Sequence, residues 1–123
     1  MAQFRARDPG IHYERLVILT TTGRKSGRPH TTPLLVHRDA ERLLVIASNA
    51  GAPTHPDWFR NLVADPNVSV EIDDQRFDAI ATPLTGDERE RLWTMLKQRF
   101  PFFADHERQV RRTIPVVALT RRR

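Results

Sequence analysis

The sequence predicts a mainly β protein with short helices: one small antiparallel barrel of about six strands, with the helices packed outside it. Three observations support this prediction. Short β-branched and apolar segments recur between tight turns. Nine prolines and five glycines favour many short elements over long helices. The length of 123 residues and the apolar content of 39% suit one compact domain that spans the whole chain, 1–123.

The first half of the chain reads as a hairpin followed by a third strand. Residues 1–12 show no periodicity, and we expect them to be loosely ordered. Apolar, β-branched runs predict strands over 14–21, 31–37 and 42–48. The basic segment 23–29 joins the first two strands as a long loop, because two glycines and a proline interrupt the extended pattern there.

The second half alternates helices with strands. A short helix runs to about residue 64, with Thr54 or His55 as its cap and Pro56 in its first turn. A second helix begins with Thr85 and Glu88 in the spacing of a capping box. The other predicted elements are strands over 68–72 and 76–83 joined by a turn at Asp73 and Asp74, a further short helix over 102–110 and a last strand over 114–119.

Charge and composition restrict the classes of function. The net charge of +5 favours anionic partners such as phosphates, carboxylates, nucleic acid or acidic lipid. The absence of cysteine excludes disulfides, zinc-thiolate sites and cysteine nucleophiles. The histidines lack metal-ligand spacing, so no metal site is predicted. No apolar run approaches the roughly 20 residues of a membrane helix. We therefore expect a cytoplasmic protein without stable membrane insertion, either free in the cytoplasm or peripheral at the inner face of the membrane.

The loop Gly23-Arg24-Lys25-Ser26-Gly27 is the most informative segment. Glycines let a ligand approach the backbone closely, and the two cations and the serine hydroxyl can bind an anion. The spacing matches neither a Walker A loop nor GxGxxG. From chemistry alone, the loop is either a phosphate cradle or a basic hairpin loop that keeps a sheet edge in solution.

Two further segments are candidates for a pocket. Ser48 and Asn49 follow a strand, where loop residues often bind ligands, although ordinary turn chemistry also explains them. Trp58 and Phe59 point in different directions on one helix, so one enters the core and the other is a candidate pocket wall. Asn61 lies one turn after Trp58, so the two side chains can share a side.

A third candidate is an aromatic face in the C-terminal third. Phe100, Phe103 and His106 recur every three residues and share one face of a helix. This face either lines a substrate pocket, or closes the barrel while the imidazole faces water.

The whole pattern resembles the deazaflavin-dependent nitroreductase family. Residues 19–34 read LTTTGRKSGRPHTTPL, which is similar to the family signature TTTGRK(S/T)GxPRxxPL. Four further blocks agree in order and spacing, and the match runs from about residue 16 to 119. These blocks are Val45–Ser48, Pro56–Leu62, Ala64–Val68 and Arg112–Val117.

The resemblance implies a split β-barrel of the FMN-binding type that binds coenzyme F420, a deazaflavin with a phosphate and an acidic oligoglutamate tail. FMN is the weaker alternative, and haem binds to the same fold. By resemblance, the phosphodiester and the ring surroundings contact the basic loop and the strand after it: Arg24, Lys25, Ser26, His30, Thr31, Thr32, Pro33 and Leu34. The ring is flanked by the third strand end and the first helix: Ile46, Ala47, Ser48, Asn49, Asp57, Trp58, Phe59 and Asn61.

The chain departs from the family pattern at several of these positions. The family often has arginine where this chain has His30, and lysine where it has Asn49. Nitroimidazole-reducing members have tyrosines along the segment that matches Phe100, Phe103 and His106, which form the predicted substrate pocket. Because phenylalanine cannot donate a proton, we expect other acceptors to be better substrates than nitroimidazoles.

The resemblance therefore implies hydride transfer from reduced F420 to a small electron-poor acceptor: a quinone, an enone, another activated alkene or a nitroaromatic. Ser48 is expected to hydrogen-bond the substrate or ring edge, and His106 to donate the proton, since an unperturbed imidazole titrates near neutrality. Two alternatives are a non-catalytic F420 carrier and a basic nucleic-acid-binding barrel. The latter is disfavoured because aromatic and basic residues are not interleaved. We expect a monomer or a homodimer without a nucleic-acid partner.

Overall fold

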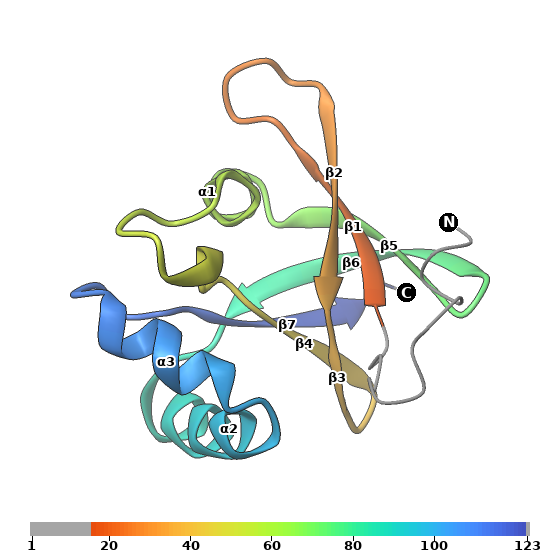
Figure 1. The fold of residues 1–123 in the computed structure, drawn as a ribbon. Coiled ribbons are helices and arrows are strands. Elements are labelled where there is room, and N and C mark those ends of the chain that lie inside the picture. The colour runs from red at the N-terminus through yellow and green to blue at the C-terminus, as the bar shows by residue number, and fades with distance from the viewer. Residues whose placement is uncertain (1–15, 123) are drawn as a thin grey trace, which may run out of the picture.

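The computed structural model describes residues 16–122 as a curled antiparallel sheet with helices beside it (Figure 1). The segment 1–12, predicted to be loosely ordered, lies outside the described residues. The strands are β1 (Leu16–Thr22), β2 (Pro29–Leu35), β3 (His37–Asp39), β4 (Arg42–Ile46), β5 (Asn67–Ile72), β6 (Gln75–Pro83) and β7 (Val116–Arg121). The helices are the 3-10 helix η2 (Asn49–Gly51), α1 (Asp57–Ala64), α2 (Gly86–Arg99) and α3 (Phe102–Gln109).

The seven strands form one sheet in the order β2-β1-β5-β6-β7-β4-β3, and all six pairings are antiparallel. The edge strands β2 and β3 are separated in sequence only by Val36. The chain itself thus joins the two edges of the sheet, which curls into a barrel. The predicted antiparallel barrel is confirmed, with one strand more than expected, because three-residue β3 is a separate strand.

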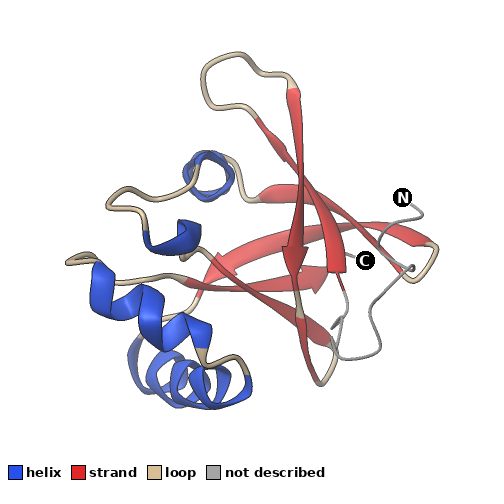
Figure 2. Cartoon of the chain, in the orientation of Figure 1, coloured by secondary structure: helices blue, strands red, loops and turns tan. Residues whose placement is uncertain are grey.

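Apolar side chains pack on both faces of part of this sheet. Val17, Leu19 and Val70 belong to a cluster inside the barrel. Leu44 and Val116 point the other way, into a second cluster that includes Trp93 of α2. Because successive residues of a strand face opposite sides, residues 43–46 of β4 and 116–119 of β7 are all apolar. Figure 2 shows α2 and α3 together on one side of the sheet, where they cover this second cluster.

Several predicted boundaries are wrong in detail. The third strand ends at Ile46, and Ser48 lies at the start of η2 instead. Helix α1 begins at Asp57 with Pro56 as its N-cap, so neither Thr54 nor His55 caps it. Thr85 is the N-cap of α2 as predicted, but its side chain makes no capping hydrogen bond.

The turn between β5 and β6 forms as predicted. Asp73 and Asp74 both have positive φ angles, 53° and 64°. Short polar residues tolerate this left-handed conformation, and two such residues in succession match the twist of an antiparallel hairpin. No helix within 16–122 is long and apolar enough to cross a lipid bilayer.

Candidate active site

Two cavities lie along β2 and the start of α1. One of about 280 Å³ is lined mainly by apolar residues and touches Trp58. The other, of about 260 Å³, lies at the basic loop and touches Asp57. Strand β2 also contributes to both, with His30 at the basic cavity and Pro33 at the apolar one. Since a strand rises about 3.3 Å per residue, the two cavities are about 10 Å apart along β2.

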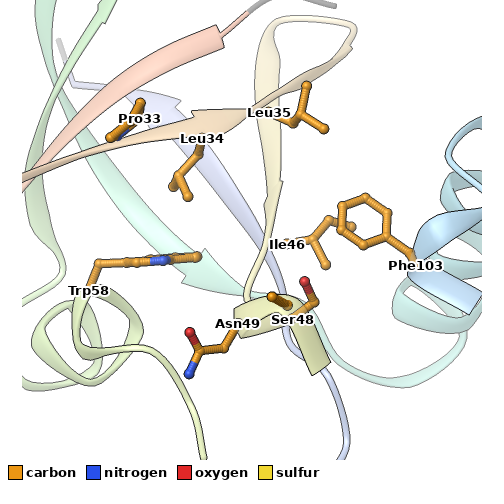
Figure 3. A pocket seen from close by; sticks show the side chains of 9 residues that line it. Pro33, Leu34, Leu35, Ile46, Ser48, Asn49, Trp58 and Phe103 are labelled. Carbon is orange, nitrogen blue, oxygen red and sulfur yellow. The ribbon is translucent and has the colours of Figure 1, made fainter. Parts of the chain in front are cut away.

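The apolar cavity draws residues from five elements, β2, β4, η2, α1 and α3 (Figure 3). Trp58 forms one wall, and Phe103 stands on the opposite side. Trp58 is 9% exposed, so α1 holds this indole in the core while one part of it faces the cavity. The complete lining is Pro33, Leu34, Leu35, Ile46, Ser48, Asn49, Ala50, Trp58 and Phe103.

Ser48 places a hydroxyl in this cavity that is bonded to an imidazole outside it. Its Oγ lies 3.1 Å from Nδ1 of His106 on α3, and the serine is 6% exposed. His106 does not line the cavity itself and reaches it through this hydroxyl. A buried hydroxyl bonded to an imidazole can both donate a hydrogen bond and exchange a proton.

Glycine shapes the basic cavity. A Cβ atom at Gly23 would lie 2.6 Å from both Ser26 Oγ and His30 Nε2, so only glycine lets these side chains close over the loop. Gly27 has φ +71°, a left-handed conformation that also favours glycine. Ser26 Oγ accepts a hydrogen bond from the backbone N–H of Arg28 at 3.1 Å and lies 3.4 Å from Nε2 of His30.

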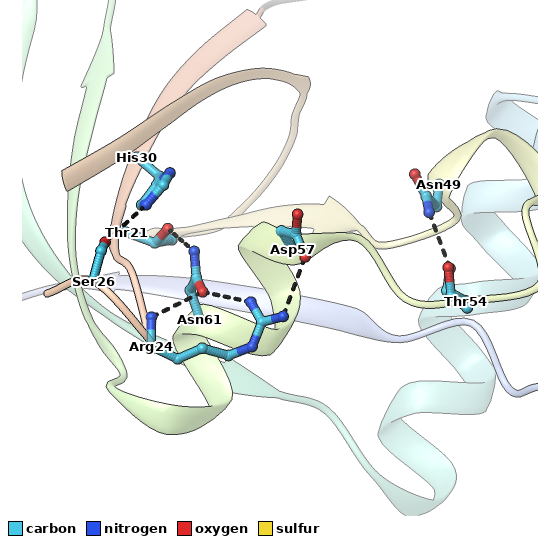
Figure 4. Close-up of polar contacts among 8 residues, drawn as sticks. All are labelled: Thr21, Arg24, Ser26, His30, Asn49, Thr54, Asp57 and Asn61. Carbon is cyan, nitrogen blue, oxygen red and sulfur yellow. Dashed lines mark hydrogen bonds and ion pairs between the residues drawn. The ribbon is translucent and has the colours of Figure 1, made fainter. Parts of the chain in front are cut away.

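Asn61 fastens this loop to the barrel (Figure 4). Its Oδ1 accepts hydrogen bonds from the backbone N–H of Arg24 at 3.2 Å and from Nη1 of Arg24 at 2.9 Å. Its Nδ2 donates to Thr21 Oγ1 at 3.2 Å. Arg24 Nη2 also lies 3.3 Å from Asp57 Oδ1. The buried amide of Asn61 thus fixes the loop against β1, and Arg24 already has protein partners.

A second cluster surrounds the loop after β4. Nη1 of Arg112 lies 2.9 Å from Nδ1 of His55 and 3.1 Å from the carbonyl oxygen of Ala47. Burial lowers the pKa of the His55 imidazole, and the positive charges of Arg112 and Arg60 lower it further. Neutral His55 can therefore accept the bond from Arg112. Burial also lowers the pKa of Arg112 from its ordinary value.

Helix α3 is held on α2 by Glu107. Its carboxylate accepts a hydrogen bond from Nε1 of Trp93 at 2.6 Å. It also forms an ion pair with Nζ of Lys97 at 2.9 Å. The hydrogen bond from Lys97 is the main cause of the lowered pKa of Glu107, and the bond from Trp93 adds to it against the opposing effect of burial. This contact sets the position of α3, and with it Phe103 and His106.

Thirteen of the predicted site residues line one of the two cavities. In the basic cavity they are Arg24, Lys25, Ser26, His30, Asp57 and Asn61, and in the apolar cavity Pro33, Leu34, Ile46, Ser48, Asn49, Trp58 and Phe103.

The other predicted site residues lie elsewhere. Thr31 and Thr32 lie on β2 between the two groups of lining residues, and Ala47 is buried in the barrel core. Phe59 packs on the His55 ring at 4.9 Å. Phe100 is 7% exposed and belongs to the cluster beneath α2 and α3, so it does not line the apolar cavity.

Four residues of the site have no predicted role in the sequence. Leu35 and Ala50 line the apolar cavity, Thr21 anchors Asn61, and Arg112 binds the loop after β4. Leu35 could have been indicated by its place directly after Pro33 and Leu34 in one apolar run. Arg112 belongs to a matching block, but its partners are backbone carbonyls, which carry no signal in a sequence.

Comparisons with known proteins identify the family of this chain. The model of the family described as F420H(2)-dependent quinone reductase matches residues 5–121. The F420H(2)-dependent quinone reductase Rv1261c of Mycobacterium tuberculosis is 36% identical over 109 residues, which cover 86% of this chain and 73% of the relative.

The solved structures that resemble this chain also include an F420-dependent reductase. An F420-H2 dependent reductase, FDR-A, has a TM-score of 0.76 at 36% identity and covers 85% of this chain and 92% of its own. A structure described as a domain-swapped dimer has a TM-score of 0.77 at 34% identity, covering 96% and 90%. A protein of the pyridoxamine 5'-phosphate oxidase type from Listeria innocua, at 13% identity and a TM-score of 0.61, covers 99% and 90% and shows the split-barrel fold alone.

The family match spans nearly the whole chain. The matched relative and the matched solved structure are both described as F420-dependent reductases. These findings favour the enzyme over the non-catalytic carrier and the nucleic-acid-binding barrel that the sequence left open. The chain belongs to the family of F420H(2)-dependent quinone reductases.

Proposed function

We propose that the two cavities form one extended site for reduced F420, with the deazaflavin ring in the apolar cavity and the phosphate and acidic tail at the basic loop. As a member of its family, the protein transfers a hydride from reduced F420 to a quinone-type acceptor. The observation that supports the proposed arrangement is the pairing of an apolar and a basic cavity along β2 and α1.

The residues of both cavities fit the chemistry of this cofactor. Lys25 and Ser26 are exposed at the basic cavity and offer a positive charge and a hydroxyl to an anion. Trp58 offers an aromatic wall to a planar ring. The apolar cavity is close to the lower end of ligand-pocket volumes, about 300 Å³, which suits a ring system while the tail remains outside.

Bound F420H2 supplies the hydride, and the protein supplies position and a proton. Reduction of a quinone adds one hydride and leaves an anionic oxygen, which takes up one proton to give the hydroquinone. We assign the Ser48 hydroxyl to hydrogen-bond this oxygen, because it faces the cavity. We assign His106 to deliver the proton through Ser48, since Nδ1 and Oγ are in hydrogen-bond contact.

A binding and turnover experiment tests the arrangement. The purified protein is titrated with F420 and with FMN, followed by the fluorescence of each cofactor. Reduced F420 is then mixed with the protein and a short-chain quinone, and the recovery of F420 fluorescence is recorded. We expect selective F420 binding that Trp58→Ala weakens. Phe59→Ala is the matched control, because Phe59 lines neither cavity. Preference for FMN, or equal effects of the two substitutions, would contradict the assignment.

The acceptor class, assembly and location are finer parts of the proposal. Enones and other activated alkenes are further acceptors, and nitroaromatics rank last because Phe103 brings no hydroxyl to the cavity.

We expect a monomer or a homodimer, and light scattering after gel filtration measures the oligomeric state. We place the protein in the cytoplasm, and its net charge of +5 supports reversible contact with anionic lipid at the inner face of the membrane. Cosedimentation with anionic and neutral vesicles tests this contact.

A further inference from the structure

Arg112 makes an unusual set of contacts with one short loop. Its Nη2 donates to the carbonyl oxygen of Ser48 at 2.7 Å, and its Nη1 donates to that of Ala47 at 3.1 Å. Its Nε donates to the carbonyl oxygen of Ala52 at 3.3 Å. One guanidinium therefore binds three backbone carbonyls within residues 47–52, and its bond to His55 holds the chain that follows.

This loop is strained. Asn49 and Ala50 have φ angles of 51° and 54°, and both lack the freedom of glycine. The left-handed conformation is unfavourable for a residue such as alanine. Hydrogen bonds from a charged group are stronger than those between neutral groups, so the contacts of Arg112 can offset the strain.

The position of Arg112 connects the two halves of the Ser48–His106 pair. Ser48 is the N-cap of η2, His106 lies on α3, and Arg112 follows α3 in the connection to β7. The contacts of Arg112 therefore tie the segment after α3 to the loop that carries Ser48. At Gly51, a Cβ atom would meet the Gln109 side chain at 2.4 Å, which shows how closely η2 and α3 already pack.

We propose that Arg112 is a positioning residue that holds the Ser48 hydroxyl against His106 and toward the acceptor. The role rests on the proposed function of Ser48, which faces the cavity while its carbonyl oxygen is bound behind it. Lysine cannot replace Arg112, because an ammonium group lacks the planar fork that reaches several carbonyls at once.

The test compares Arg112→Lys with Arg42→Lys. Arg42 is a partly buried arginine that binds Asp39 at 2.9 Å and Glu88 at 2.6 Å at the opposite end of β4. With F420H2 and quinone, we expect Arg112→Lys to lower kcat about tenfold to a hundredfold, with little change in F420 affinity. In a Ser48→Ala background, Arg112→Lys should cause no further loss, whereas Arg42→Lys should leave kcat unchanged.

A readout without cofactor separates this proposal from the one it rests on. The NMR chemical shift of His106 Nδ1 in the free protein reports its contact with Ser48. Arg112→Lys should move this chemical shift in the same direction as Ser48→Ala, and Arg42→Lys should not move it. An unmoved chemical shift, or a loss of kcat additive with that of Ser48→Ala, would overturn the role of Arg112. A moved chemical shift combined with full activity of Ser48→Ala would support Arg112 and overturn the proton-delivery role of Ser48.

Discussion

The Nδ1 atom of His106 lies 3.1 Å from the Oγ atom of Ser48, although the two residues are 58 positions apart in the chain. The sequence indicates each of them as a site residue on separate grounds. Ser48 follows a strand, and His106 matches a family tyrosine. Their contact explains how an imidazole outside the cavity can take part in chemistry inside it.

Removing either partner should slow proton delivery without weakening cofactor binding. We expect Ser48→Ala and His106→Ala each to lower kcat for quinone roughly a hundredfold, since positioned proton transfer contributes about 10²–10⁴-fold. The double variant should lose little more than the worse single one, because the two act as a unit. Stopped-flow turnover and F420 titration measure both quantities. Ser69→Ala, on β5 and outside both cavities, is the control; additive losses would argue against a shared path.

The basic loop provides a second prediction, about charge placement. Lys25 lines the basic cavity and Arg28 does not, although both are exposed on the same loop. Lys25→Ala should raise the Kd for F420 about tenfold, which corresponds to roughly 1.4 kcal/mol, and the difference should shrink at high salt. Arg28→Ala removes the same charge and should have a much smaller effect. Equal effects in fluorescence titrations at two salt concentrations would mean that the loop acts only through its overall charge.

The fold was largely predictable because its signals are local. The alternation in Asn67–Ile72 and the turn at Asp73 and Asp74 indicate β5 and the hairpin after it. β3 was not predictable, since a strand of three residues is too short to show an alternation of apolar and polar side chains. The capping box at Thr85 failed for a different reason: sequence gives the spacing, but the rotamer of the threonine decides whether the bond forms.

The site was predictable where a motif marks it. The basic loop and Trp58 follow from residue types and spacing. The roles of Asn61 and Arg112 did not follow, because each acts on backbone or side-chain atoms brought close by the barrel. Asn61 bonds Thr21 and Arg24 from 40 and 37 positions away, and Arg112 bonds carbonyls about 60 positions away.

His30 offers a substitution that should strengthen binding. The imidazole lines the basic cavity together with Ser26 and Lys25. His30→Arg adds a permanent charge and a planar fork suited to phosphate. We expect F420 to bind about tenfold more tightly, measured by fluorescence titration, with kcat nearly unchanged. His30→Gln, which adds no charge, is the control. Tighter binding with both variants would show that size, not charge, limits the site.

Glu107 makes the stability of the α2–α3 contact dependent on pH. Its folded-state pKa lies below the ordinary 4.5, chiefly because of Lys97 and also because of Trp93. Its stabilisation is therefore present above pH 4.5 and is lost as the pH falls through the lower folded-state pKa. Since the carboxylate is partly exposed, it contributes about 1 kcal/mol. Glu107→Gln should lower the Tm by a few degrees at pH 7.

The two melting curves should converge as the pH falls through the folded-state pKa of Glu107, which lies below 4.5, because the protonated wild-type carboxyl holds Lys97 no better than glutamine does. Thermal unfolding followed by circular dichroism from pH 7 to 3 measures this. Glu71→Gln, at an exposed position of β5, makes the same change of charge and should leave the Tm difference small at every pH. A Glu107→Gln deficit that persists undiminished at pH 3 would show that the shape of the side chain, and not its charge, holds α3 in place. In that case Phe103 and His106 would keep their positions in acid.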